Sequence, residues 1–431
     1  MTKQRPEAPV TTRHPADLAD EFQRLDAGDA AAALRALPRE TASLVLAEMD
    51  EEFVATLSHA LSTDELRDLL GTMPHDEAAD IAAELPQAQR DQILARLEPG
   101  ASSKLSQFLS YPEDSAGSIM TDQFHALPVD ATIEACRELL AHKDESQFRG
   151  ATYLYVVDTA GKLSGVITTR DLVFRKSDRI VRDVMKPDVK FVRVRDDQET
   201  VARLFAQYHY MALPVLEDDG RLVGVVNASQ AIAVIQQEAT EDMQRMVGVS
   251  GEERTFTPWN RAILRRLPWL MVNLATAFLA AMVVSLFEKT IAQWTALAVF
   301  LPIVAGQGGN AGMQTLTVVI RGMALDEISG SAGRKALVKE IIMGLLNGLA
   351  TGLVVGLVGY LWKGSFALGV IVSLAMFLNM LAAAMSGVLI PTTLRAARID
   401  PALASSIFLT TVTDVAGFFF FLGLATLALR M

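Results

Sequence analysis

The feature that most constrains this chain is the succession of long apolar stretches that follows Leu267. A helix needs roughly 20 apolar residues to cross a hydrocarbon core, and the sequence predicts five such spans. They are Leu267–Phe287, Gln293–Ile320, Ala336–Trp362, Phe366–Pro391 and Ala402–Leu429. We therefore predict an all-α transmembrane domain of five helices over 261–431, with the two termini on opposite sides of the membrane.

Basic residues in the short loops indicate the orientation of these spans. Arg261, Arg265 and Arg266 lie just before the first span, Arg395 and Arg398 lie between the fourth and fifth, and four more basic residues lie between the second span and the first turn of the third: Arg321, Arg334, Lys335 and Lys339. The other side has only Lys289, Lys363 and Arg430. The positive-inside rule predicts a multi-pass protein of a bacterial-type inner (plasma) membrane, with a cytosolic N terminus and the C terminus outside.

Residues 1–260 have the opposite charge, with 44 Asp and Glu against 27 Lys and Arg. This net charge of −17 disfavours nucleic acid and anionic lipid surfaces as partners of the cytosolic half. Solvated carboxylates on the surface of a soluble domain are the usual explanation of such an acidic excess. Carboxylate oxygens are also the ligands that hard divalent cations prefer. Four acidic residues in two clusters are candidates for such ligands: Glu217, Asp218, Glu241 and Asp242.

Two repeat systems divide the acidic half. Leu34–Pro38 recurs as Leu70–Pro74, a spacing of 36 residues that favours stacked helical hairpins in a superhelical N domain over 1–115, with an ordinary helical bundle as the alternative. Tyr153–Val157 followed by Gly161–Ile167 is echoed by Ala212–Leu216 followed by Gly220–Val226. Each copy predicts a β-hairpin that leads into a helix.

The second duplication resembles a tandem pair of α/β CBS domains, and we place it at 116–230, with the copies at about 116–178 and 179–230. Members of that family often hold a ribose with a Thr or Ser and an Asp three residues later. The first copy has Thr168 and Asp171 at these positions, whereas the second has Asn227 and Gln230. ATP binding at the first module is one interpretation of this pair, and a helix N-cap is the other.

The segment 231–260 joins the duplicated domain to the first span. Ala231–Gly248 has a helical pattern and carries Glu238, Glu241 and Asp242, so it is either a mechanical link between a sensor and a pore or a passive linker.

A single carboxylate lies deep in the predicted spans. At 1.5 Å per residue, Asp414 is about 18 Å along a helix that starts at Ala402, just beyond the midplane. Ser406 and Thr410 share its helical face. Charges at such depth are usually retained for function, and we interpret the stripe as an aqueous cation pathway, with a proton relay or a neutral hydrogen-bonding carboxyl as the alternatives.

The second span contains Pro302 and a run of small and amide residues that a lipid-facing helix avoids. Proline and glycine weaken this helix, and the amide side chains bring oxygens to membrane depth. Both features indicate a water-filled pathway lined by protein. The third span carries Gly344, Gly348, Gly352 and Gly356, a ladder that we interpret as helix packing, while the neighbouring Asn347 is left open as a pore residue. The residues of the second span predicted to line the pathway are Gly308, Gly309, Asn310 and Gln314.

The order of these domains, together with Gly308–Gln314, Glu340…Gly344, Asn379…Gly387…Pro391 and Asp400…Asp414, resembles the MgtE family of magnesium channels. The resemblance implies a homodimer in the lipid bilayer, with Mg²⁺ as both substrate and regulator. It implies that Asp414 is the pore carboxylate, that Asp400 lies at the cytosolic mouth, and that Mg²⁺ bound to the acidic N and CBS domains closes the pore.

Two other functions compete with a channel that passes Mg²⁺ down its electrochemical gradient. The first is a proton- or Na⁺-coupled divalent cation exchanger, in which Asp414 binds and releases the coupling ion. The second is an intramembrane enzyme or signalling subunit, but the spans contain no His or Cys for a zinc site or a Cys/His dyad. We therefore expect no enzymatic activity.

Overall fold

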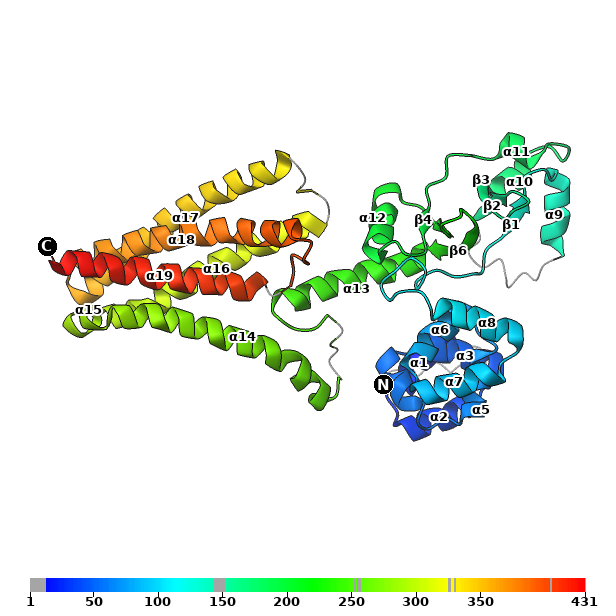
Figure 1. Ribbon diagram of the computed structural model, residues 1–431, viewed down its shortest axis with the longest axis horizontal. Helices are drawn as coiled ribbons and strands as arrows, with labels where there is room; N and C mark the ends of the chain where they lie inside the picture. Colours follow the sequence, from blue (N-terminus) through cyan, green and yellow to red (C-terminus); the bar gives the residue numbers. More distant parts are fainter. Residues whose placement is uncertain are drawn as a thin grey trace, which may run out of the picture. The chain divides into compact units, whose positions relative to one another are not determined.

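The computed structural model describes residues 13–142, 152–251, 253, 257–324, 327–328, 331–403 and 405–430. It divides into two compact units, Met1–Gln236 and Gln237–Met431 (Figure 1).

The first unit begins with short helices that each pack on the helix two positions further along the chain, from α1 on α3 to α6 on α8. This pattern is the superhelical stack that the sequence predicted. Pro38 and Pro74 are the N-caps of α3 and α6, so the repeat of 36 residues contains three short helices and not the predicted hairpin. The helices are α1 (Pro15–Phe22), α2 (Ala27–Arg35), α3 (Arg39–Ala47), α4 (Glu51–Leu57), α5 (Thr63–Leu70), α6 (His75–Glu84), α7 (Gln87–Arg96) and α8 (Pro99–Phe108).

Two small sheets of identical topology follow. In the first, β1 (Ala126–Pro128) pairs in parallel with β2 (Tyr153–Val157), which pairs antiparallel with β3 (Leu163–Thr168). The second repeats this order with β4 (Val192–Arg193), β5 (Ala212–Leu216) and β6 (Leu222–Asn227). The duplicated hairpins are therefore confirmed. Their helices are α9 (Ile133–Ala141), α10 (Thr169–Phe174), α11 (Val181–Val184) and α12 (Gln198–Tyr208).

The two copies exchange their opening segments. Thr121, at the start of the first copy, bridges to Val225 of β6, whereas Lys186, at the start of the second, bridges to Val166 of β3. The hydrophobic core of the helical domain continues through Phe108 and Met120 into Val215 of the second sheet. The helical domain and the second sheet therefore share one core.

The second unit is helical and is built around α18 (Phe366–Ala396), which packs against three other helices. It begins within α13 (Ala228–Met246), a helix of 19 residues that starts in the first unit. The remaining helices are α14 (Trp259–Leu286), α15 (Glu288–Gln293), α16 (Leu297–Ala324), α17 (Ser331–Lys363) and α19 (Ser405–Arg430).

Among the described residues, four helices are long and apolar enough to cross a membrane: Trp259–Leu286, Ala332–Lys363, Phe366–Ala396 and Ser405–Arg430. α16 stands where the sequence predicted the second span and has 28 residues. Gln307, Asn310 and Gln314 lower its mean hydropathy, so the structure confirms four apolar candidates and leaves the fifth span as a prediction.

The glycine ladder of α17 lies directly against the backbone of α18. A Cβ atom at Gly352 would lie 2.7 Å from the carbonyl oxygen of Ser373, and one at Gly356 would lie 2.6 Å from the carbonyl oxygen of Gly369. The hydroxyl of Ser373 donates to the carbonyl of Gly352 at 2.7 Å. The ladder therefore packs two helices closely, as the sequence predicted.

Replacing Gly352 with Ala tests this packing. An Ala normally stabilises a helix by about 1 kcal/mol relative to Gly, but here the added methyl forces the helices apart at a cost of about 1–3 kcal/mol. We expect Gly352→Ala to lower the Tm of the detergent-purified protein by several degrees. Gly423→Ala, where an added Cβ meets nothing within 4 Å, is the control and should not lower it. Equal Tm values for the two variants would contradict the close packing.

Candidate ion pathway

α16 has two faces of different chemistry. Its glycine face is buried, and a Cβ at Gly308 or Gly312 would collide with Asn379 of α18 or Leu409 of α19. The opposite face exposes Gln307, Asn310 and Gln314 on the surface of the chain. The amides therefore do not stabilise the interior of the chain, although an amide facing hydrocarbon is costly.

Asn379 holds the buried side of this helix. Its side chain is fully buried, and its Nδ2 donates to the carbonyl oxygen of Val304 at 2.9 Å. A Cβ at Gly417 of α19 would lie 2.7 Å from the same nitrogen. Asn379 thus joins α16, α18 and α19, a role that the sequence did not reveal, although Asn379 belongs to the motif that carried the resemblance.

The polar stripe of α19 lies beside this junction. Ser406, Thr410 and Asp414 are all half-buried, and Gly417 is buried against Asn379. A Cβ at Gly309 would lie 3.9 Å from the hydroxyl oxygen of Thr413, the residue before Asp414. The structure therefore brings the glycines of α16 and the carboxylate-bearing part of α19 together, as the pathway hypothesis requires.

A cavity of about 270 Å³ lies between α16, α17 and α18. Gln314, Glu340 and Asn347 all line it. Glu340 is 4% exposed and accepts a hydrogen bond from the hydroxyl of Thr315 at 2.9 Å. Asn347, which the sequence left open, therefore shares a polar cavity with two residues of the motifs that the sequence singled out.

Three of the predicted regulatory carboxylates gather at the end of α13. Arg245 forms an ion pair with Glu241 one turn earlier, and its Nη1 donates to Oδ2 of Asp400 at 2.7 Å. Asp400 lies just before α19 and also accepts from the backbone N–H of Ala402 at 2.8 Å. One guanidinium therefore joins α13 to the segment that leads into α19. Arg245 was not predicted from the sequence because its partner Asp400 is remote in the chain.

Apolar contacts seat the same end of α13 on the bundle. Met246 packs with Leu316 and Ile320 of α16 and with Leu409 of α19. A Cβ at Gly248 would lie 3.4 Å from Cβ of Trp269. The end of α13 thus contacts both helices of the candidate pathway.

The pKa of Asp242 is raised at the end of α13. Burial raises its pKa from 3.8 to about 6, and the negative charge of Asp400 adds to the shift. An ionised Asp242 therefore opposes the docking of α13 on the bundle, and a positive charge placed between the two carboxylates relieves that repulsion.

The other predicted sites lie in the first unit. Glu217 and Asp218 occupy the turn between β5 and β6, where Asp218 pairs with Arg193 at 3.4 Å and is largely exposed. No group of three or more His, Cys, Asp or Glu residues within the described ranges is arranged to hold a metal ion. Glu241, Asp242 and Asp400 carry the carboxylate oxygens that Mg²⁺ prefers as ligands, and in this structure Arg245 pairs with Glu241 and Asp400.

Thr168 and Asp171 form the N-cap of α10. The Thr168 hydroxyl accepts from the Asp171 N–H, while Oδ2 of Asp171 accepts from the Thr168 N–H at 3.1 Å. In the second copy, Gln230 reaches back to the Asn227 N–H in the same way at 2.9 Å. The capping interpretation is therefore confirmed, and the nucleotide interpretation stays a prediction.

Together, the apolar helices, the polar stripe of α19 beside α16, and the helical and CBS domains ahead of them are the features of a membrane transporter with additional helical and CBS domains. Three family models match the chain: MgtE intracellular N domain at 13–114, CBS domain at 116–178 and 181–237, and the divalent cation transporter model MgtE at 301–424. The chain belongs to the MgtE family of magnesium transporters, whose members are transporters and not enzymes.

Curated magnesium transporters match most of the length of this chain. The magnesium transporter MgtE of Bacillus subtilis (strain 168) is 31% identical over 414 residues, which cover 96% of this chain and 91% of the relative. The magnesium transporter MgtE of Thermus thermophilus is 32% identical over 336 residues, which cover 78% of this chain and 74% of the relative. A solved cytosolic domain of the Mg²⁺ channel MgtE in complex with ATP is 32% identical, covers 52% of this chain and 91% of its own, and has a TM-score of 0.48.

The raised pKa of Asp242 predicts how the stability of the folded protein depends on pH. Since the folded protein holds this proton more tightly than the unfolded chain does, stability falls as the pH rises from 3.8 to about 6 and is constant above. We expect Asp242→Asn to raise the Tm by several degrees at pH 7 and to have no effect near pH 4.

Tryptophan fluorescence measures this effect in the second unit alone, because all four Trp residues, at 259, 269, 294 and 362, lie there. Asp218→Asn, which removes an exposed carboxylate from the first unit, is the control. A Tm gain from Asp242→Asn that is the same at pH 4 and pH 7 would rule out the proposed repulsion.

Proposed function

We propose that this protein is a Mg²⁺-selective channel that admits Mg²⁺ down its electrochemical gradient and closes when cytosolic Mg²⁺ is plentiful. The observation that supports this best is a half-buried carboxylate, Asp414, in a helix that is otherwise apolar enough to span a membrane, one residue after Thr413, which lies beside Gly309 of α16. Mg²⁺ loses its water reluctantly, so a carboxylate that contacts the ion through its hydration shell is suitable for passage.

The exposed amide face of α16 supports a homodimer. Gln307, Asn310 and Gln314 are unburied in one chain, and at membrane depth they need water or another protein chain as a partner. A second copy that packs against this face provides both, since an axis between the copies leaves a polar path lined by α16 and α19. Two Asp414 carboxylates then face the ion.

The proposed gate is the contact of α13 with Asp400. α13 starts in the acidic first unit and ends where Arg245 joins Glu241 to Asp400. Cations that neutralise the carboxylates of 1–260, whose net charge is −17, favour compact packing, and their loss lets repulsion pull on α13. Glu217, Asp218, Glu241, Asp242 and Asp400 are the proposed regulatory ligands.

The remaining parts of the proposal follow from topology and from the CBS pair. With 1–260 in the cytosol, five spans and an outside C terminus, an inner-membrane potential drives a divalent cation inwards by roughly 4.6 kcal/mol per 100 mV. At the first CBS module, Thr168 and Asp171 are the pair proposed to hold the ribose of ATP.

Replacing Asp414 with Asn tests the pathway. The amide has the shape of the carboxyl but no charge, so we expect Mg²⁺ flux into liposomes at low Mg²⁺ on the cytosolic side to fall by at least about tenfold, a loss equivalent to about 1.4 kcal/mol. Asp130→Asn, an exposed carboxylate paired with Arg182 in the first unit, is the control.

The same liposomes distinguish a channel from an exchanger. A channel conducts Mg²⁺ under an imposed voltage without any proton or Na⁺ gradient. Flux that appears only with such a gradient would identify a coupled exchanger, and normal flux through Asp414→Asn would remove Asp414 from the pathway.

Arg245→Gln tests the gate. Removing the guanidinium leaves Glu241, Asp242 and Asp400 facing one another without the charge that joins them, so we expect flux at intermediate cytosolic Mg²⁺ to rise several-fold above wild type. Arg203→Gln, an exposed position on α12, is the control. Unchanged flux and unchanged Mg²⁺ inhibition in Arg245→Gln would show that this ion pair does not contribute to closure.

A further inference from the structure

The cavity between α16, α17 and α18 contains a charge pair that the proposed ion pathway does not use. Its volume is about 270 Å³, and Lys339 and Glu340 of α17 both line it. Nζ of Lys339 lies 3.5 Å from Oε1 of Glu340. The cavity therefore presents one positive and one negative group side by side.

The two charged groups differ in their freedom to move. Glu340 is almost fully buried, and its Oε2 accepts a hydrogen bond from the Thr315 hydroxyl of α16 at 2.9 Å. The Lys339 side chain is 63% exposed. The carboxylate is therefore fixed inside the cavity, whereas the ammonium group of Lys339 lies at its opening and can turn to another anion.

Polar and apolar groups follow one another along the same face of α17. Glu340, Asn347 and Val354 are spaced by seven residues, or about two turns, so they share a face. At 1.5 Å per residue, Asn347 is about 10 Å further along the helix than Glu340, and it also lines the cavity. Val354 and Val358 are exposed. The order along this face is a charge pair, an amide and an apolar surface.

The cavity opens sideways from the bundle, since two of its lining residues, Met343 and Asn347, are exposed. α17 is one of the four helices that are apolar enough to span a membrane. Its first turns carry Arg334, Lys335 and Lys339, and the positive-inside rule predicts that this end lies at the cytosolic surface. A lipid of the cytosolic leaflet can therefore reach the cavity without leaving the membrane.

From these observations we propose that the cavity binds the headgroup of a phospholipid that carries a primary ammonium group, such as phosphatidylethanolamine. The lipid ammonium replaces Lys339 at Glu340, the phosphate pairs with the released Lys339, and the Asn347 amide donates to an ester carbonyl. The acyl chains lie along the apolar face that includes Val354. The polar groups of this face then have partners that hydrocarbon alone cannot provide.

Three other ligand classes fit the cavity less well. A divalent cation is repelled by Lys339 and an anion by Glu340, whereas a zwitterion pairs with both charges. A soluble zwitterion pairs with the two charges but leaves the Asn347 amide facing hydrocarbon. The proposal depends on the membrane placement of α17 and not on the proposed channel or its gate.

Binding of defined lipids to the delipidated, detergent-purified full-length protein tests the proposal, with native mass spectrometry as the readout. Phosphatidylethanolamine and phosphatidylcholine with identical acyl chains differ only at the headgroup nitrogen, which carries N–H donors in the first lipid and none in the second. We expect phosphatidylethanolamine to bind at least about tenfold more tightly, because its ammonium group donates charge-assisted hydrogen bonds to Glu340.

Two variants locate the binding. Glu340→Gln should bind the two lipids equally, because the amide keeps an acceptor for the Thr315 hydroxyl but has no charge. Lys339→Gln should weaken both lipids by a similar factor, since they share the phosphate. Lys335→Gln, which removes an exposed charge from the same end of α17 outside the cavity lining, is the matched control and should bind as wild type.

A series on the wild-type protein does not depend on how the variants fold. Each methyl group added to the nitrogen of phosphatidylethanolamine removes one donor, so the affinity should fall stepwise from the unmethylated lipid to phosphatidylcholine. A flat series would overturn the proposal.

Three further results would also overturn it. The first is a preference for phosphatidylethanolamine that persists in Glu340→Gln, and the second is tighter binding of phosphatidylglycerol, which would identify a basic surface for anionic lipids. The third is equally tight binding of glycerophosphoethanolamine, the same headgroup without acyl chains, which would identify a soluble ligand. None of these readouts depends on ion flux, so they are independent of the proposed channel function.

Discussion

Polar groups at membrane depth need a polar partner, and this requirement governs the second unit. α16 meets it with two faces. Its glycines let Asn379 and Leu409 approach so closely that α16, α18 and α19 form one packed group. Its amides lie on the opposite face, where Gln307 and Asn310 are exposed and Gln314 lines the cavity beside Glu340. The glycines of the same helix therefore explain why the bundle is closely packed around Asn379.

The charges at the end of α13 act between this helix and the segment that leads into α19. Asp242, with its raised pKa, and Asp400 repel one another, while Arg245 attracts both Glu241 and Asp400. Asp242 and Asp400 therefore oppose the docking of α13 on the bundle while Arg245 favours it, and the two effects partly offset each other.

Much of the fold was predictable because its signals are local. Apolar length predicted the four long apolar helices, the duplicated strand-like runs predicted both β-hairpins, and the helical spacing of Ser406, Thr410 and Asp414 predicted one stripe. The remainder depends on contacts between distant residues. Arg245 looks like any solvated helix residue until Asp400 is beside it, and Asn379 looks like an ordinary polar residue in a span until Gly308 and Gly417 enclose it. The exchanged opening segments of the CBS copies are equally invisible along the chain.

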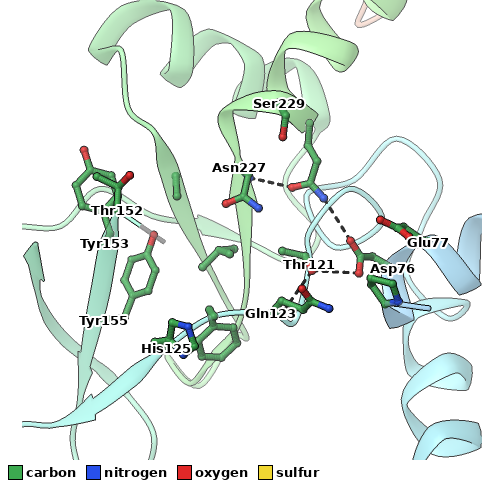
Figure 2. A pocket seen from close by; sticks show the side chains of 15 residues that line it. Asp76, Glu77, Thr121, Gln123, His125, Thr152, Tyr153, Tyr155, Asn227 and Ser229 are labelled. Atoms are coloured by element: carbon green, nitrogen blue, oxygen red, sulfur yellow. Dashed lines mark hydrogen bonds between the residues drawn. The ribbon is translucent and has the colours of Figure 1, made fainter. Parts of the chain in front are cut away.

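The contact between the helical domain and the second CBS sheet also depends on a buried charge. Asp76, at the start of α6, accepts hydrogen bonds from the Thr121 hydroxyl at 3.1 Å and from Nε2 of Gln230 at 3.4 Å (Figure 2). Burial raises the pKa of Asp76. Since α6, the segment before β1 and the start of α13 are joined through this one carboxylate, the packing of the first unit depends on its charge in the same way as the docking of α13 depends on Asp242.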